Sequence, residues 1–254
     1  MVLLRRQKLT IISLLIYWPA IFVATHISKV PRWFRSTGVS DKSLHYLVYL
    51  ILVFFLWSAI NPYGKVNWRR AAVWCVLFVI VWYGVFDEWL QGYVGRDPNV
   101  MDFFTDLAGT LTGLILLSLF SFWHAALIVA GIFIFVLTNL SRVNMSETLP
   151  TISATFNLFV FSFFSIIWIE YIRRFIQLQA PQAKWLGVAF ILPVALLLAV
   201  RLFSVILGRG FGLTDTAVAA LGITVAIFTY YITALFRCRI ANRRWRATDT
   251  GVEN

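Results

Sequence analysis

Residues 41–60 read DKSLHYLVYLILVFFLWSAI, a polar start followed by an uninterrupted apolar run. A run of this length matches the roughly 20 residues that an α-helix needs to cross the hydrocarbon core of a bilayer. The same pattern recurs along the chain, which is 60% hydrophobic and 17% aromatic. Soluble domains are only about 45–50% apolar. The sequence therefore predicts an all-α, polytopic transmembrane helical bundle.

Eight segments have this character. Their predicted bounds are 9–28, 43–60, 70–90, 102–121, 123–140, 152–172, 185–207 and 213–236. We divide the chain into a first four-helix membrane domain (1–121), a second one (122–240) and a basic cytoplasmic tail (241–254). The two cysteines, Cys75 and Cys238, have neither disulfide nor metal-ligand spacing and are predicted to be free and buried.

The net charge of +11 does not indicate nucleic-acid binding. The basic residues stand at the ends of apolar segments, which is typical of contact with anionic lipid headgroups. With the N-terminus in the cytoplasm, cytoplasmic segments carry 14 Lys and Arg residues and outer segments carry 7. This bias predicts a protein of the inner (cytoplasmic) membrane with both termini cytoplasmic, although four basic residues in the first outer loop oppose it. The bilayer is its expected partner, and the oligomeric state is left open.

Acidic residues are scarce, yet five of the eleven stand in short motifs at the predicted outer ends of three segments of the first half. An ionisable side chain inside a bilayer costs roughly 3 kcal/mol, so such a cluster indicates a site. We expect a shared polar pocket facing away from the cytoplasm. Its candidate residues are Asp41, Lys42, His45, Tyr49, Asp87, Glu88, Gln91, Arg96, Asp102 and Asp106.

Several of these residues also have simpler interpretations. Asp102 could cap the helix that it begins, and Lys42 and Arg96 could contact headgroups. Glu88 and Asp106 are harder to explain in this way. Each is predicted about one turn below the interface, where a carboxylate needs a basic partner or a water-filled cavity.

The motifs resemble those of the VanZ-like membrane proteins over roughly residues 9–121. The shared pattern is Asp41-Lys42-x-x-His45-x-x-x-Tyr49, Asp87-Glu88-x-x-Gln91, Arg96, then Asp102-x-x-x-Asp106-x-x-Gly109-x-x-x-Gly113. Asp106 departs from the pattern, because the family usually has asparagine there. The family is named for low-level resistance to the glycopeptide teicoplanin. The resemblance implies a role in the cell envelope but supplies no biochemical mechanism.

The second half contains a partial repeat of the motif spacing of the first half. Gly208-Arg209, Asp215 and Gly222 repeat the spacing of Gly95-Arg96, Asp102 and Gly109 without a gap. Two parallel four-helix repeats, the second one degenerate, would explain this constant offset. Arg201 stands at the position of Glu88. It is expected either to pair with an acidic residue of the first half or to reach the outer headgroups.

Gly109 and Gly113 also form a Gly-x-x-x-Gly motif, which lets another helix approach closely. Three functions remain open. The first is a non-enzymatic pocket that binds a cell-envelope component or an amphipathic compound. The second is an enzyme acting on a lipid-linked substrate, with His45 as acid or base. The third is a small-solute transporter. No catalytic residue, cofactor or metal site is assigned, although the acidic residues offer ligands for a divalent ion.

Overall fold

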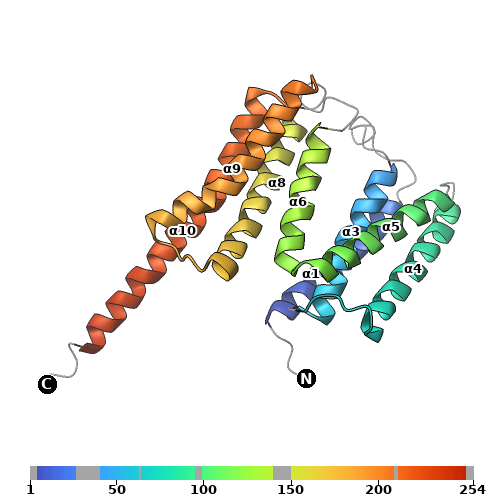
Figure 1. Cartoon of the computed structure of the whole chain (residues 1–254), viewed down its shortest axis with the longest axis horizontal. Coiled ribbons are helices and arrows are strands. Elements are labelled where there is room, and N and C mark those ends of the chain that lie inside the picture. Colours follow the sequence, from blue (N-terminus) through green and yellow to red (C-terminus); the bar gives the residue numbers. More distant parts are fainter. Residues whose placement is uncertain are drawn as a thin grey trace. The chain divides into compact units, whose positions relative to one another are not determined.

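The computed structural model describes residues 5–26, 41–62, 64–94, 99–139, 150–208 and 211–249. The chain divides into two compact units, Met1–Ala125 (unit 1) and Ala126–Asn254 (unit 2). The described residues form helices and connecting segments and no strands (Figure 1). This confirms the predicted all-α class.

Unit 1 contains α1 (Arg5–Thr25), α3 (Asp41–Ile60), α4 (Ala71–Gln91) and α5 (Val100–Leu119), with a short 3-10 helix η1 (Gly92–Val94) after α4. Helix α6 (Phe122–Asn139) begins at the end of unit 1 and leads into unit 2. There follow α8 (Pro150–Tyr171), the π-helical turn η2 (Ile172–Ile176), α9 (Ala183–Ile206) and α10 (Leu213–Asp249). Helix α10 continues past the predicted bound at residue 236.

Seven helices in the described part of the chain are long and apolar enough to cross a membrane, as expected of a multi-pass membrane protein. The remaining helix, α1, has a shorter apolar stretch, Gln7–Val23. An eighth span formed by α1 therefore stays a prediction. Both cysteines are free, but the prediction that they are buried is wrong. Each lies on an exposed helix face. An apolar segment does not by itself predict burial, because the lipid-facing surface of a membrane protein is apolar as well.

Helix α1 runs antiparallel to α3. The Gln7 side chain donates to the carbonyl of Ala59 (3.3 Å), and the Tyr17 hydroxyl donates to the carbonyl of Val48 (3.0 Å). The end of α1 therefore lies at the same end of unit 1 as the start of α3. The end of α4 and the start of α5 join them there, as the contacts of the polar side chains show below.

Helix α5 lies beside α3 (Figure 1). Two glycines of α5 make this contact close. A Cβ atom on Gly109 would lie 2.3 Å from the carbonyl oxygen of Tyr46, and one on Gly113 would lie 2.2 Å from Cγ1 of Val53. Real Cβ atoms do not come this close. At position 109 the obstacle is backbone, so only glycine allows the approach there, whereas a Cβ atom at position 113 would require the Val53 side chain to shift. The approach also places Asp106, which precedes Gly109 by about one turn, against α3.

Unit 2 has a corresponding close contact between α10 and α8. A Cβ atom on Gly222 would lie 2.6 Å from the carbonyl oxygen of Leu158. Elsewhere in the unit, Trp185 of α9 is 1% exposed and stacks on Tyr230 of α10, with ring centroids 5.3 Å apart. Apolar packing thus dominates the interior of unit 2.

Candidate functional site

Three helices of unit 1 bring one ionisable side chain each to a common point. His45 of α3, Glu88 of α4 and Asp106 of α5 are all buried, and their nitrogen and carboxylate atoms lie within 4.8 Å of one another. Nδ1 of His45 is 3.0 Å from Oδ1 of Asp106. We call these three residues the His–Glu–Asp cluster. All three residues belong to the motifs found in the sequence, but those motifs do not indicate how close the three helices bring them.

Glu88 links the end of α4 to the start of α5. Its Oε2 accepts a hydrogen bond from the backbone N–H of Asn99 (2.8 Å). Asn99 is the N-cap of α5, because its side chain accepts from the backbone N–H of Met101 (3.0 Å). The suggestion that Asp102 caps this helix is therefore wrong. The helix starts two residues earlier than predicted, which leaves Asp102 buried in its first turn.

Two oxygen atoms of the cluster lack a hydrogen bond to any described residue. These are Oε1 of Glu88 and Oδ2 of Asp106, and both are buried. Oδ2 of Asp106 and the hydroxyl of Tyr49 lie on the side of Gly84, each 3.7 Å from where a Cβ would stand. A buried polar atom without a partner costs about 1–3 kcal/mol, and more if it is charged. The cluster therefore has unused capacity to bind a cation or a hydrogen-bond donor.

A second polar group surrounds Asp87, which is completely buried. Its Oδ2 accepts from Nε2 of Gln91 (2.9 Å), and its Oδ1 accepts from the hydroxyl of Thr25 (3.0 Å). Nδ1 of His26 lies 3.7 Å from the same Oδ1. In contrast to Glu88, Asp87 has a partner on each oxygen. We call Asp87, Gln91, Thr25 and His26 the Asp87 cluster.

Thr25 and His26 were not among the residues singled out from the sequence. Their only sequence signal is a polar pair directly after the apolar run of α1. The other candidates vary in position. Lys42 is exposed, Asp41 begins α3 with a side chain outside the described part, and Arg96 and Arg209 lie outside the described residues.

In unit 2 the polar contacts form around Asp215. It accepts from the hydroxyl of Ser153 (2.8 Å), from Nδ2 of Asn157 (3.0 Å) and from the backbone N–H of Gly212 (3.2 Å). Arg201 donates to the carbonyl of Phe211 within the same unit. Pairing of Arg201 with an acidic residue of the first half stays a prediction.

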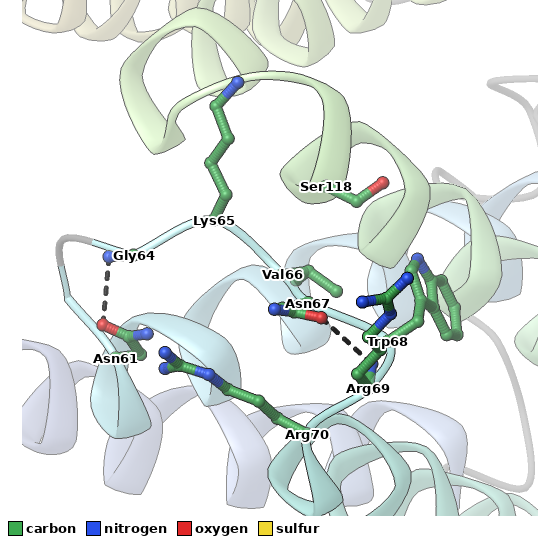
Figure 2. Close-up of a pocket in the computed structure, with 9 residues that line it drawn as sticks. All are labelled: Asn61, Gly64, Lys65, Val66, Asn67, Trp68, Arg69, Arg70 and Ser118. Carbon is green, nitrogen blue, oxygen red and sulfur yellow. Dashed lines mark hydrogen bonds between the residues drawn. The ribbon is translucent and has the colours of Figure 1, made fainter.

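The opposite end of unit 1 carries a basic pocket of about 580 Å³ (Figure 2). It is formed by the connection between α3 and α4 and the end of α5. The lining residues are Asn61, Gly64, Lys65, Val66, Asn67, Trp68, Arg69, Arg70 and Ser118. The ammonium group of Lys65 donates to the carbonyl of Leu119 at the end of α5 (2.7 Å). From the sequence alone, these basic residues are interpreted only as determinants of membrane orientation.

The chain matches no family model, no curated protein and no solved structure. The resemblance to VanZ-like proteins therefore depends on the motif residues and their spacing. Any function has to be argued from the geometry of the polar clusters.

Proposed function

We propose that unit 1 is a VanZ-like membrane domain. It binds the head group of a cell-envelope component or an amphipathic compound at its outer end, and so alters sensitivity to glycopeptides such as teicoplanin. One observation carries this proposal: Glu88 and Asp106 share a single histidine, and each keeps a buried oxygen without a hydrogen bond to a described residue.

An excess of buried negative charge favours a positively charged ligand group. Two carboxylates in apolar surroundings are costly unless a counter-charge reaches them. An ammonium group of an amphipathic compound would supply that charge and donate hydrogen bonds to the free oxygens. Lys42 is exposed on the first turn of α3 and would meet an anionic part of the same head group, together with Arg96. A zwitterionic or peptide-bearing head group fits this combination.

We also infer that the protein lies in the inner membrane with both termini in the cytoplasm, and that α1 is an eighth span. The basic pocket at the opposite end of unit 1 supports this orientation, because it carries Lys65, Arg69 and Arg70. Cysteines introduced at positions 42 and 65 should react with membrane-impermeant reagents from opposite sides. Labelling of both from the same side would refute the orientation.

We further infer that unit 2 is a degenerate copy of the first four helices. Asp215 and Gly222 have the same spacing as Asp102 and Gly109. Both glycines stand against a backbone carbonyl of a neighbouring helix, as described above. The two repeated glycines thus make the same kind of helix contact, which supports the repeat.

A second candidate function is supported by one contact. Nδ1 of His45 lies 3.0 Å from Oδ1 of Asp106, and a carboxylate that orients an imidazole is a common acid–base arrangement. The candidate is an enzyme acting on a lipid-linked envelope substrate. Turnover of such a substrate by purified protein, abolished by His45→Ala, would favour this function over simple binding.

The binding proposal is tested in cells that express the wild-type chain, Glu88→Gln or Glu170→Gln. Glu170 is the matched control, because it lies in unit 2 and pairs with Arg173 (2.5 Å) at a partly exposed position. Teicoplanin sensitivity and protein abundance in the membrane are measured together. We expect Glu88→Gln to lose the wild-type effect at normal abundance and Glu170→Gln to keep it. Equal sensitivity of cells with and without the wild-type chain would refute the proposal.

Asp106→Asn refines the test. This change restores the residue that VanZ-like proteins usually carry at this position. It keeps a side chain that can hydrogen-bond to His45. We expect the effect on teicoplanin sensitivity to be retained, because Asp106 is the carboxylate already in contact with His45. Glu88, which is held by the Asn99 N–H, is unchanged.

A further inference from the structure

We propose that His45, Glu88 and Asp106 bind one divalent transition-metal ion. The inference goes beyond the proposed function, because the metal would bind to the protein directly and without a head group. The ion would take the same two oxygens that the proposed function offers to a cationic head group, so the two ligands compete for one site, and the experiments below are chosen to separate them.

The distances suit a metal site. Metal–nitrogen and metal–oxygen bonds of about 2.0–2.2 Å place neighbouring ligand atoms about 3 Å apart. Nδ1 of His45 and Oδ1 of Asp106 already have this separation, at 3.0 Å. The ligand atoms of all three residues lie within 4.8 Å of one another. A small inward movement of the Glu88 carboxylate would complete the set.

The unused oxygens point to a ligand that the described side chains do not supply. Oε1 of Glu88 and Oδ2 of Asp106 are buried and have no hydrogen-bond partner among the described residues. The other oxygen of Glu88 is held by the N–H of Asn99 at 2.8 Å. Such a bond is what orients a carboxylate ligand in a metal site and leaves its second oxygen for the ion.

The charge and the donor atoms select the kind of ion. Two carboxylates carry a charge of −2, which a divalent cation cancels, and a neutral site suits the low dielectric of a membrane interior. One imidazole and two carboxylates fit Zn²⁺, Mn²⁺ or Fe²⁺. Ca²⁺ and Mg²⁺ prefer oxygen atoms alone.

Unit 2 provides an internal comparison. At the offset of the repeated pattern the corresponding positions are Leu158, Arg201 and Ala219, and the polar residue beside Leu158 is Asn157, so no carboxylate remains. Asp215 is close to Asn157, but its oxygens accept hydrogen bonds from Ser153 and other donors. One ion per chain is therefore expected. Asp106 is also the position where this chain departs from the VanZ-like pattern, so the site would be a property of this protein.

The test uses the full-length chain, purified in detergent without a polyhistidine tag and stripped with a chelator. Bound metal is measured by mass spectrometry after dialysis against Zn²⁺ or Mn²⁺, and Co²⁺ absorption reports the ligand field. We expect about one ion per wild-type chain. His45→Ala, Glu88→Gln and Asp106→Asn should each weaken binding by about 100-fold or more, since even supporting residues contribute 10–100-fold.

Asp87→Asn is the matched control, because Asp87 neighbours Glu88 in sequence but belongs to the Asp87 cluster. It should bind metal like the wild type. Absence of stoichiometric metal in the wild type would overturn the inference, and so would binding as tight as that of the wild type in all three cluster variants. If a variant fails to fold, the wild-type stoichiometry and Co²⁺ spectrum still decide.

The two proposals fail in different ways. A wild-type chain that binds no metal, while Glu88→Gln loses the effect on teicoplanin, refutes the metal site alone. A chain that binds metal but leaves teicoplanin sensitivity unchanged refutes the proposed function alone. Asp106→Asn separates them further, because it should lose the metal and keep the cellular effect.

Discussion

Helices α3 and α4 of unit 1 and helices α8 and α9 of unit 2 bury partly matching sets of positions with different chemistry. Five buried positions of α4 match buried positions of α9 at the offset of the repeated pattern: Val76, Ile80, Gly84, Asp87 and Gln91 against Ala189, Pro193, Leu197, Val200 and Ser204. The buried Val73 and Glu88 fall on Leu186 and Arg201, which are partly buried. In α3 and α8 only part of the buried set matches, at an offset shorter by one: His45, Tyr49, Leu52 and Val53 against Asn157, Phe161, Phe164 and Ser165. Helix packing is therefore the common element of the two units.

The carboxylates are where the units diverge. Asp87 corresponds to Val200, and Asp106 corresponds to Ala219, with all four positions buried. The same arrangement of buried positions forms with apolar side chains there, so packing does not require these acids. Buried carboxylates that folding does not need are candidates for function. On the proposal that unit 2 is a degenerate copy, it serves as a reference for which features of unit 1 packing requires.

The glycine contacts offer the strongest way to break the comparison. Gly109→Ala would place a Cβ atom 2.3 Å from the Tyr46 carbonyl, and Gly222→Ala would place one 2.6 Å from the Leu158 carbonyl. Since backbone atoms cannot move aside easily, we expect each change to lower the free energy of unfolding by about 3 kcal/mol. Titration with sodium dodecyl sulfate, followed by circular dichroism, measures this.

Gly187→Ala is the control for both changes, because nothing lies within 4 Å of a Cβ atom there. It should leave stability unchanged or raise it by up to about 1 kcal/mol, through the better helix propensity of alanine. A loss at Gly187 equal to that at Gly109 would mean that the close helix contacts are not what makes these glycines necessary.

A pair of Asp→Asn changes sharpens the contrast between the polar groups. Asp215 accepts hydrogen bonds from three groups. In Asp215→Asn the new NH₂ group would face one of these donors, which should lower the free energy of unfolding by about 2 kcal/mol. Asp106→Asn removes an excess charge and can keep its hydrogen bond to His45. It should cost less than about 0.5 kcal/mol in metal-free protein. A cost at Asp106 equal to that at Asp215 would assign Asp106 a structural role.

Much of this fold follows from the sequence, because long apolar runs have few alternatives to membrane helices. The apolar run after Asp41 predicts α3 to its last residue, Ile60. The spacing of Gly109 and Gly113 predicts a close helix contact, and the structure identifies α3 as the helix that makes it. In each case the local pattern alone carries the information.

The contacts between helices are what the sequence leaves open. Nothing in its spacing indicates that Thr25 would reach Asp87, or that His45 would lie 3.0 Å from Asp106. The sequence also does not reveal that Asn99 is the N-cap of α5, because asparagine and aspartate are equally good N-cap residues and Asp102 stands only three positions later. The exposure of Cys75 follows from packing, since an apolar sequence does not distinguish a lipid-facing side from a buried one.

The smallest expected difference concerns Thr25 and Thr138, which correspond to each other at the offset of the repeated pattern. The hydroxyl of Thr25 donates to Oδ1 of Asp87 at 3.0 Å. The hydroxyl of Thr138 is buried and has no hydrogen-bond partner among the described residues. Thr25→Val should therefore lower the free energy of unfolding by about 1.5 kcal/mol, because it leaves a buried carboxylate oxygen short of a donor. Thr138→Val should be neutral or slightly stabilising.

Both changes replace a hydroxyl by a methyl group of similar volume, so the comparison isolates the polar contribution. Detergent unfolding of the two variants is measured side by side. Equal losses would show that the hydroxyl of Thr25 contributes nothing specific to Asp87. A loss of stability at Thr25 alone would show that unit 1 depends on hydrogen bonds to hold the Asp87 carboxylate. It would also show that no such bond is needed at Thr138 of unit 2.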